Sequence, residues 1–183
     1  MTYTIDIAGM KCDLPICRVT DDLYIGAFVI FGKVPLTIHA AEQLLQRAPE
    51  FDIIVAPEAK SIPLAYELSR QSGKPYIIAR KKAKAYMTGV FEVKVRSITT
   101  AGEQTLIIDT ADADAIRGKR IAIVDDVIST GESLRATEEL VTKAGGNIVA
   151  KLAVLAEGDA AHRPDITVLA PLPLFNPDGT VKG

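Results

Sequence analysis

The stretch RIAIVDDVISTGESL, from Arg120 to Leu134, carries the strongest structural signal in this chain. Four apolar residues run into two adjacent carboxylates, Asp125 and Asp126, as in a buried strand with acids at its carboxyl end. A loop of small residues follows, and then a helical pattern begins. Backbone N–H groups at the start of a helix bind anions, and carboxylates accept hydrogen bonds from hydroxyl groups. The sequence therefore predicts a site for a phosphate beside hydroxyl groups. The loop residues are Ser129, Thr130, Gly131, Glu132 and Ser133.

This motif resembles the phosphoribosyl pyrophosphate (PRPP) signature of the type I phosphoribosyltransferases. That signature is a hydrophobic run, two acids, two mostly apolar residues and a small Thr-Gly loop, and VDDVISTGES matches it. An ordinary strand, loop and helix with a capping Ser129 or Thr130 would explain the hydroxyls and Gly131. It would not explain two neighbouring acids at a strand end, where like charges repel. The resemblance implies that the acids hold the ribose hydroxyls of PRPP and that residues 129–133 bind its 5′-phosphate.

Composition and charge exclude several other classes of function. The chain has 183 residues, 48% of them apolar, which is enough for one domain with a normal core. Its formal net charge of −2 gives no electrostatic footprint for nucleic acid or an acidic membrane. No apolar run approaches the ~20 residues that span a bilayer, and the first residues do not resemble a secretory signal. We therefore expect a cytoplasmic protein in which Cys12 and Cys17 are free thiols.

Strands and helices alternate along the chain, and this order predicts a parallel sheet covered on both faces. We expect one α/β domain, residues 1–183, with a central, mostly parallel sheet flanked by helices in a core of about 35–170. Residues 1–34 are expected to form a small hood, and the Pro-rich run that starts at residue 170 is expected to end in a loose tail. Strands are predicted at 23–31, 51–56, 76–79, 106–109, 120–125, 148–155 and 166–170, and helices at 35–48, 62–71 and 132–143.

A second strand, loop and helix predicts another anion site. The loop Glu58, Ala59, Lys60 and Ser61 follows the strand FDIIVA, so its amides and the lysine can face one ligand. A simple turn with an exposed lysine would have the same pattern. The loop resembles the pyrophosphate loop of the same family, where Glu-Ala-Arg-Gly is common, and the resemblance implies that these four residues bind pyrophosphate. Lys60 in place of arginine keeps the charge but loses the bidentate fork.

The basic run Arg80-Lys81-Lys82-Ala83-Lys84 ends the next predicted strand. Such a run is usually a solvated loop. This one resembles a stretch of the purine phosphoribosyltransferases whose basic residues reach PRPP, partly across a dimer interface. The resemblance implies a homodimer in which Arg80 and Lys84 stabilise the charge that develops on the leaving pyrophosphate.

Residues 85–104 resemble the mobile catalytic hairpin of the family, which closes over bound PRPP and excludes water. The adenine branch carries a Glu-Tyr-Gly cluster there, whereas this chain has Thr100, Ala101 and Gly102. In this respect the hairpin is closer to that of the xanthine enzymes and of the PRPP-binding purine repressors.

The base is expected over Val127 and Ile128. The 6-oxopurine enzymes place a lysine just after the strand that follows the signature helix, where a cationic donor suits a carbonyl oxygen. Glu157, Gly158 and Asp159 stand there in this chain. We therefore interpret the chain as an enzyme of purine salvage that converts adenine and PRPP to AMP and pyrophosphate. The alternatives are a xanthine, guanine or hypoxanthine phosphoribosyltransferase, an enzyme for orotate or uracil, or a PRPP-binding regulator without catalysis.

The resemblance also implies Mg²⁺ as cofactor, held between PRPP and the paired acids, directly or through water. The charge of Asp125 and Asp126 would favour a cationic ribosyl transition state, and Arg80 and Lys84 would complete the catalytic set. The expected partners are PRPP, a purine base and a second copy of the chain, with no nucleic acid and no membrane.

Overall fold

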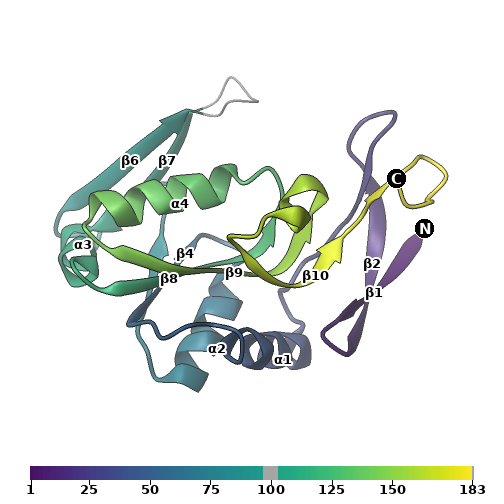
Figure 1. Cartoon of the computed structure of the whole chain (residues 1–183). Helices are drawn as coiled ribbons and strands as arrows, with labels where there is room; N and C mark the ends of the chain where they lie inside the picture. The colour runs from purple at the N-terminus through teal and green to yellow at the C-terminus, as the bar shows by residue number, and fades with distance from the viewer. Residues whose placement is uncertain (97–102, 183) are drawn as a thin grey trace.

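The computed structural model describes residues 1–96 and 103–182. Its centre is a parallel sheet of five strands in the order β10-β9-β8-β4-β5, which lies between two layers of helices (Figure 1). The α/β class with a central parallel sheet is therefore confirmed. The strands are β4 (Ile53–Pro57), β5 (Tyr76–Ala79), β8 (Arg120–Ile128), β9 (Asn147–Glu157) and β10 (Thr167–Leu172).

Helices cover both faces of this sheet, because each is apolar on the side that it turns to the strands. The first layer holds α1 (Val34–Leu45) and α2 (Ile62–Ser72), and the second holds α3 (Thr110–Ile116) and α4 (Glu132–Lys143). Proline stands in the first turn of both α1 and α2, and Gly73 ends α2 in the left-handed conformation. The bounds of α4 are those predicted from the sequence.

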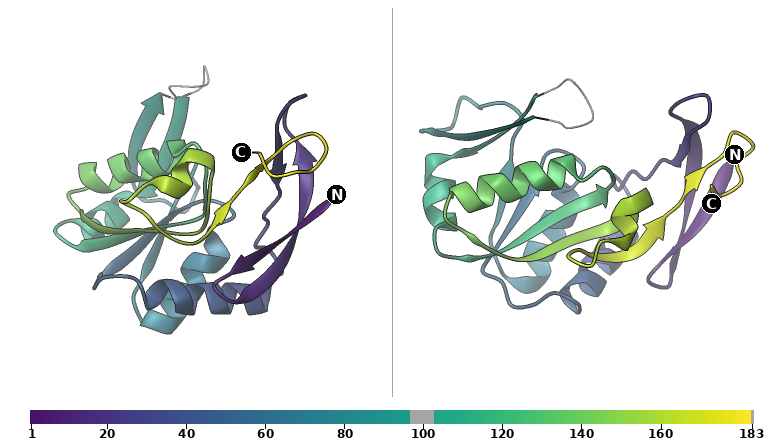
Figure 2. Two further views of the ribbon diagram at one scale, coloured as in Figure 1. Left: turned by 45° about the vertical axis from the view of Figure 1, so that its right-hand side comes forward. Right: turned by 45° about the horizontal axis from the view of Figure 1, so that its top comes forward.

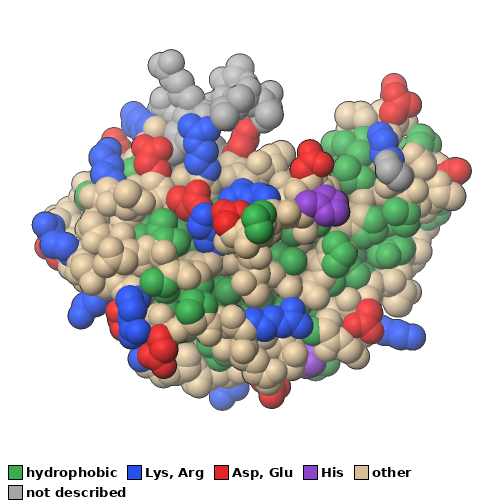
Figure 3. Space-filling model, in the orientation of Figure 1, with side chains coloured by type: hydrophobic (Ala, Val, Ile, Leu, Met, Phe, Trp, Pro, Cys, Tyr) green, Lys and Arg blue, Asp and Glu red, His purple; other side chains and the backbone are tan. Residues whose placement is uncertain are grey.

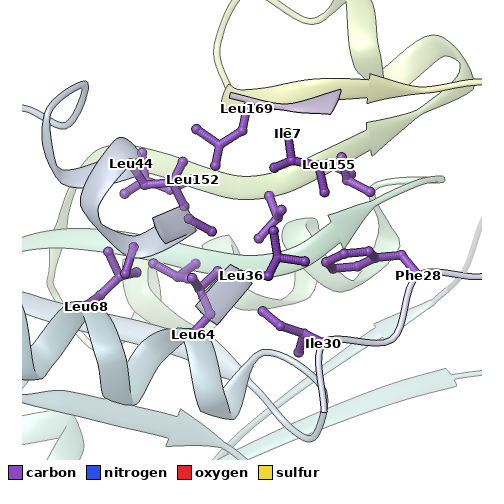
Figure 4. Packing of buried hydrophobic residues seen from close by; sticks show 14 of the residues in the cluster. Ile7, Phe28, Ile30, Leu36, Leu44, Leu64, Leu68, Leu152, Leu155 and Leu169 are labelled. Carbon is purple, nitrogen blue, oxygen red and sulfur yellow. The ribbon is translucent and has the colours of Figure 1, made fainter. Parts of the chain in front are cut away.

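Two hydrophobic cores result, one on each face of the sheet. Figure 4 shows the first, where Leu64 and Leu68 of α2 and Leu36 and Leu44 of α1 approach Leu152 of β9. The second core joins α3 and α4 to the other face of the same strands. Both cores hold the strand ends rigidly, which fixes the loops that follow them.

The order of the strands creates a crevice between β4 and β8. From β4 the chain continues through α2 to β5 on one side, and from β8 it continues through α4 to β9 on the other. Ligands bind at such switch points, beyond the carboxyl ends of the strands. The opposite ends of β4 and β8 are tied together, because Nη2 of Arg120 donates to Oδ1 of Asp52 across 2.8 Å.

A hood stands beside the central sheet, as expected, but its parts differ from the prediction (Figure 2). It is an antiparallel sheet of β1 (Thr2–Ile7), β2 (Met10–Arg18), β3 (Tyr24–Gly26) and β11 (Leu174–Phe175). The predicted strand at 23–31 is wrong beyond residue 26: Phe28 and Ile30 are apolar because they are buried in the first core, without strand partners. The predicted loose tail is also wrong, since β11 pairs with β3 and Phe175 is fully buried.

The hairpin expected at 85–104 is formed by β6 (Val90–Arg96) and β7 (Glu103–Asp109), which pair in an antiparallel two-stranded sheet. Its root is tied to the central sheet because Arg80, after β5, exchanges two backbone hydrogen bonds with Ile107 of β7. The Thr100-Ala101-Gly102 departure from the adenine branch lies outside the described residues.

Two smaller expectations concern thiols and membranes. Cys12 is buried, Cys17 is exposed and both are free. Within residues 1–96 and 103–182, no helix is long and apolar enough to cross a membrane.

Candidate functional site

A pocket of about 660 Å³ opens at the crevice between β4 and β8. It brings together the two loops that the sequence analysis singled out, although they are far apart in the chain. The residues that line it are Pro57, Glu58, Ala59, Lys60, Lys81, Thr105, Leu106, Asp125, Asp126, Val127 and Ser133.

The paired acids lie at the carboxyl end of β8, and both are buried. Oδ1 of Asp125 accepts a hydrogen bond of 2.9 Å from the backbone N–H of Asp126. Nζ of Lys60 lies 3.2 Å from Oδ2 of Asp126, so an ion pair spans the crevice from the loop after β4 to β8. That Oδ2 atom is buried and accepts no hydrogen bond from the described residues. Only the ion pair with Lys60 compensates its charge among the described residues.

Burial and the neighbouring negative charge strongly raise the pKa of Asp125. Removal from water and the charge of Asp126 raise the pKa of Asp125 to about 7, against the smaller opposing effect of Lys60. Two carboxylates in one dry site cannot both ionise freely. A ligand that brings hydroxyl groups or a cation would relieve this repulsion, so the pair is suited to binding rather than to stabilising the fold.

The loop after β4 is held by hydrogen bonds on both sides. Glu58 accepts from the backbone N–H of Lys81 at 2.8 Å and pairs with Nη1 of Arg80 at 3.2 Å. Burial is the largest single effect and raises the pKa of Glu58, but the hydrogen bonds from Lys81 and Arg80 and the nearby positive charges together lower it. Buried Ser61 donates from Oγ to the carbonyl oxygen of Pro57. The peptide bond between Glu58 and Ala59 is cis. Glu58 and Ser61 therefore shape the loop, while Lys60 presents its charge to the pocket.

The basic run after β5 is placed differently from the expectation. Within the described residues, the pocket lining includes Lys81 but neither Arg80 nor Lys84. The guanidinium of Arg80 is engaged by Glu58, and only the backbone of that residue reaches β7. Sequence reasoning missed Lys81, as well as Thr105 and Leu106 of the hairpin. Lys81 was inside the basic run, but the run does not indicate which of its members faces the pocket.

The loop after β8 forms a second, smaller pocket of about 200 Å³ next to the first. Gly131 has a φ of +79°, a conformation that suits glycine, and it stands directly before α4. The first turn of α4 lines this pocket, and the positive end of the helix dipole there favours an anion. All five predicted loop residues contribute to this pocket, with Asp125, Val127, Ile128 and Leu134.

Taken together, the crevice offers two places for anions with a pair of acids between them. Lys60 and Lys81 supply positive charge at one end, and the start of α4 supplies N–H groups at the other. Asp125 and Val127 line both pockets. This arrangement fits a ligand with phosphate groups at both ends and hydroxyl groups in the middle.

The two histidines lie outside this arrangement. Nε2 of His39 is 2.9 Å from the carbonyl oxygen of Ala8, so it fastens the turn of the hood hairpin to α1. His162 ends η1 (Gly158–His162), a short 3₁₀ turn after β9. Neither lines either of the two pockets.

Comparisons with known proteins agree with this geometry. Residues 35–169 match the phosphoribosyl transferase domain family. A hypoxanthine/guanine phosphoribosyltransferase of Methanococcus voltae is 35% identical over 124 residues, which are 67% of this chain and 63% of that protein. An adenine phosphoribosyltransferase of Kosmotoga olearia is 40% identical over 119 residues, which are 64% of this chain and 65% of that protein. Proteins named orotate phosphoribosyltransferase also match. The chain thus spans less than two thirds of the length of these relatives.

Solved structures agree with the fold. The crystal structure of adenine phosphoribosyltransferase from Thermoanaerobacter pseudethanolicus superposes with a TM-score of 0.63 at 25% identity, and the match covers 75% of this chain and 79% of that one.

The raised pKa of Asp125 predicts a specific dependence of stability on pH. The unfolded chain ionises this residue near pH 4, whereas the folded protein keeps the proton until about pH 7, so the free energy of unfolding falls as the pH rises through that window. Asp125→Asn removes this loss and keeps an acceptor for the N–H of Asp126. At pH 8 without ligand we expect Asp125→Asn to be more stable than the wild type by on the order of 2 kcal/mol.

Urea unfolding of both proteins between pH 4 and pH 8 measures this difference. The gain should shrink toward zero at pH 4. A difference that does not vary with pH would contradict the raised pKa of Asp125.

Proposed function

Because the chain belongs to the phosphoribosyl transferase domain family, we propose that it transfers the ribose 5-phosphate of PRPP to a purine base, with adenine as the base. The observation that carries the proposal is the meeting of Lys60, the paired acids and the start of α4 at one crevice. PRPP has a phosphate at one end, a pyrophosphate at the other and two ribose hydroxyls between them. Its chemistry therefore matches the order of groups along the crevice.

In this proposal each part of PRPP meets a defined part of the site. The loop 129–133 holds the 5′-phosphate, because the first N–H groups of α4 lack partners within the helix. Asp125 and Asp126 accept hydrogen bonds from the ribose hydroxyls, and the buried Oδ2 of Asp126 supplies one acceptor. Lys60 and Lys81 face the pyrophosphate, where negative charge develops as the bond to C1′ breaks.

The reaction forms a bond between a purine nitrogen and C1′ and breaks the bond from C1′ to pyrophosphate, and the base releases its proton to solvent. Among the described residues that line the pocket none is a histidine, and we assign no general base. Positioning of the two substrates and stabilisation of the leaving group account for the rate. The acids contribute further, since their charge favours positive charge on the ribose.

The paired acids also fit Mg²⁺. This ion prefers oxygen ligands and keeps several waters, so one or two carboxylates beside a phosphate ligand suffice. Oδ2 of Asp126 is paired only with Lys60 among the described residues, and a cation would relieve the repulsion between the two acids. When bound, Mg²⁺ would neutralise charge on the pyrophosphate of PRPP.

The choice of adenine depends on the end of β9. Glu157, the last residue of that strand, is half-buried, and burial raises its pKa against the smaller opposing effect of the Lys60 charge. A carboxylate is an acceptor that suits an exocyclic amino group, whereas the carbonyl of an oxopurine needs a donor. The adenine name of the Kosmotoga relative supports this choice. The hypoxanthine/guanine name of the Methanococcus relative makes an oxopurine the second candidate.

We also propose that the chain forms a homodimer. Large apolar side chains are exposed beside a groove of about 210 Å³ between the start of α1 and α2. A contiguous apolar surface of this kind is typical of a protein interface. The residues are Phe31, Val34, Ile38 and Tyr66, whose exposed fractions run from 42% to 62%.

The base preference is tested by nucleotide formation with PRPP and Mg²⁺ against adenine, hypoxanthine, guanine, xanthine, uracil and orotate. We expect rapid formation of AMP, because residues 157–159 at the end of β9 hold no lysine that could bind an oxygen at position 6. Preference for an oxopurine would refute the argument from Glu157. Binding of PRPP without turnover of any base would identify a PRPP-binding regulator instead.

Lys60→Ala tests the pyrophosphate end of the site. We expect the KM for PRPP to rise about tenfold, the effect of losing roughly 1.4 kcal/mol of a charge-assisted contact, while the KM for the base stays the same. Lys143→Ala, at the exposed end of α4, is the matched control. A change confined to the KM for the base would show that Lys60 contacts the base and not the pyrophosphate of PRPP.

The dimer is tested by sedimentation of Tyr66→Glu, which puts a charge into the apolar surface. We expect the wild type to sediment as a dimer and the variant as a monomer, because burial of an unpaired charge is unfavourable. Val19→Glu alters an exposed apolar residue of the hood and serves as control. A wild type that sediments as a monomer at micromolar concentration would exclude the dimer.

A further inference from the structure

Arg163 lies well beyond the phosphate loop in the sequence, directly after η1, and yet it reaches that loop. Its side chain is fixed by a bidentate ion pair: Nε donates to Oδ1 of Asp165 at 3.0 Å and Nη2 donates to Oδ2 at 2.8 Å. Two parallel hydrogen bonds from one guanidinium restrict both its position and its orientation. Nη1 is left to face in the other direction.

A chain of charges anchors this pair to the core of the molecule. Nζ of Lys151, on β9, donates to Oδ2 of Asp165 at 2.8 Å and also pairs with Glu138 of α4. Figure 3 shows acidic and basic side chains gathered over α4. The pKa of Asp165 is lowered by Arg163 first and by Lys151 second, so the carboxylate stays ionised in the pH range of the cell. Arg163 is thereby held to both β9 and α4.

The free end of the guanidinium packs against Gly131. A methyl group placed on Gly131 would lie only 3.1 Å from Nη1 of Arg163, so the two groups are in close contact. Arg163 lines neither pocket, so its contact with the loop is made at Gly131 and not in the cavity. The contact falls on the residue that precedes the first turn of α4.

We propose that Arg163 is a positioning residue for the loop that binds the 5′-phosphate. By packing against Gly131 it holds the loop in the shape that receives the 5′-phosphate at the start of α4. The inference rests on the proposed assignment of residues 129–133 to the 5′-phosphate.

The test is the affinity of the whole chain for two separate ligands, measured by calorimetry. Ribose 5-phosphate probes the loop, and Mg²⁺-pyrophosphate probes the other end of the site at Lys60. For Arg163→Ala we expect the Kd for ribose 5-phosphate to rise about tenfold and the Kd for pyrophosphate to stay within about twofold, because only the first ligand meets the loop.

Two further variants and a control separate positioning from folding. Arg163→Lys keeps the charge but not the fork, so we expect an intermediate loss. Asp165→Asn weakens the ion pair that holds Arg163 without changing Arg163 itself. This variant should also raise the Kd for ribose 5-phosphate and leave the Kd for pyrophosphate unchanged. The control is Arg117→Ala, which removes an exposed arginine paired with Asp114 at 3.0 Å far from either pocket.

Each outcome decides between the claims. A selective loss of affinity for ribose 5-phosphate in Arg163→Ala and Asp165→Asn supports the inference. Wild-type affinity in both variants, or equal loss of both ligands, overturns it while leaving the proposed function in place. A wild type that binds neither ribose 5-phosphate nor PRPP overturns the proposed function and this inference together.

Discussion

The ion pair between Lys60 and Asp126 spans the crevice on which the rest of the site depends. It joins the loop after β4 to the end of β8, while Asp52 and Arg120 tie the opposite ends of the same two strands. The two neighbouring strands β4 and β8 are thus held together at both of their ends. Because the chain leaves them in opposite directions, their helices cover opposite faces and the carboxyl edge stays open. Fold and site are consequences of one topological arrangement.

The same crevice contains an electrostatic conflict that a folded protein would otherwise avoid. Asp125 and Asp126 are buried side by side, and Lys60, whose side chain is half exposed, compensates only part of their charge. The conflict disappears when a ligand brings hydroxyl groups or a cation to the acids. Unfavourable electrostatics in the free protein therefore become favourable contacts in the complex, which is a common property of functional sites.

Local patterns in the sequence predicted the elements that local physics determines. The bounds of α4 are predicted by Gly131 before it and by the apolar spacing within it. The position of Lys60 is predicted by the pattern of a strand, a loop and the start of a helix. Contacts between distant segments gave no such signal. Phe175 reads as part of a Pro-rich tail, but it is buried because β11 pairs with β3. The prediction named Arg80 and not Lys81, but the side chain of Arg80 is engaged by Glu58 from another loop, whereas Lys81 lines the pocket.

The most direct measurement is a crystal structure of the protein with PRPP and Mg²⁺. Our account places the 5′-phosphate in the loop 129–133, the ribose hydroxyls at Asp125 and Asp126, and the pyrophosphate beside Lys60 and Lys81. A structure with the pyrophosphate in the loop 129–133, or with PRPP outside the crevice between β4 and β8, would contradict the central claim.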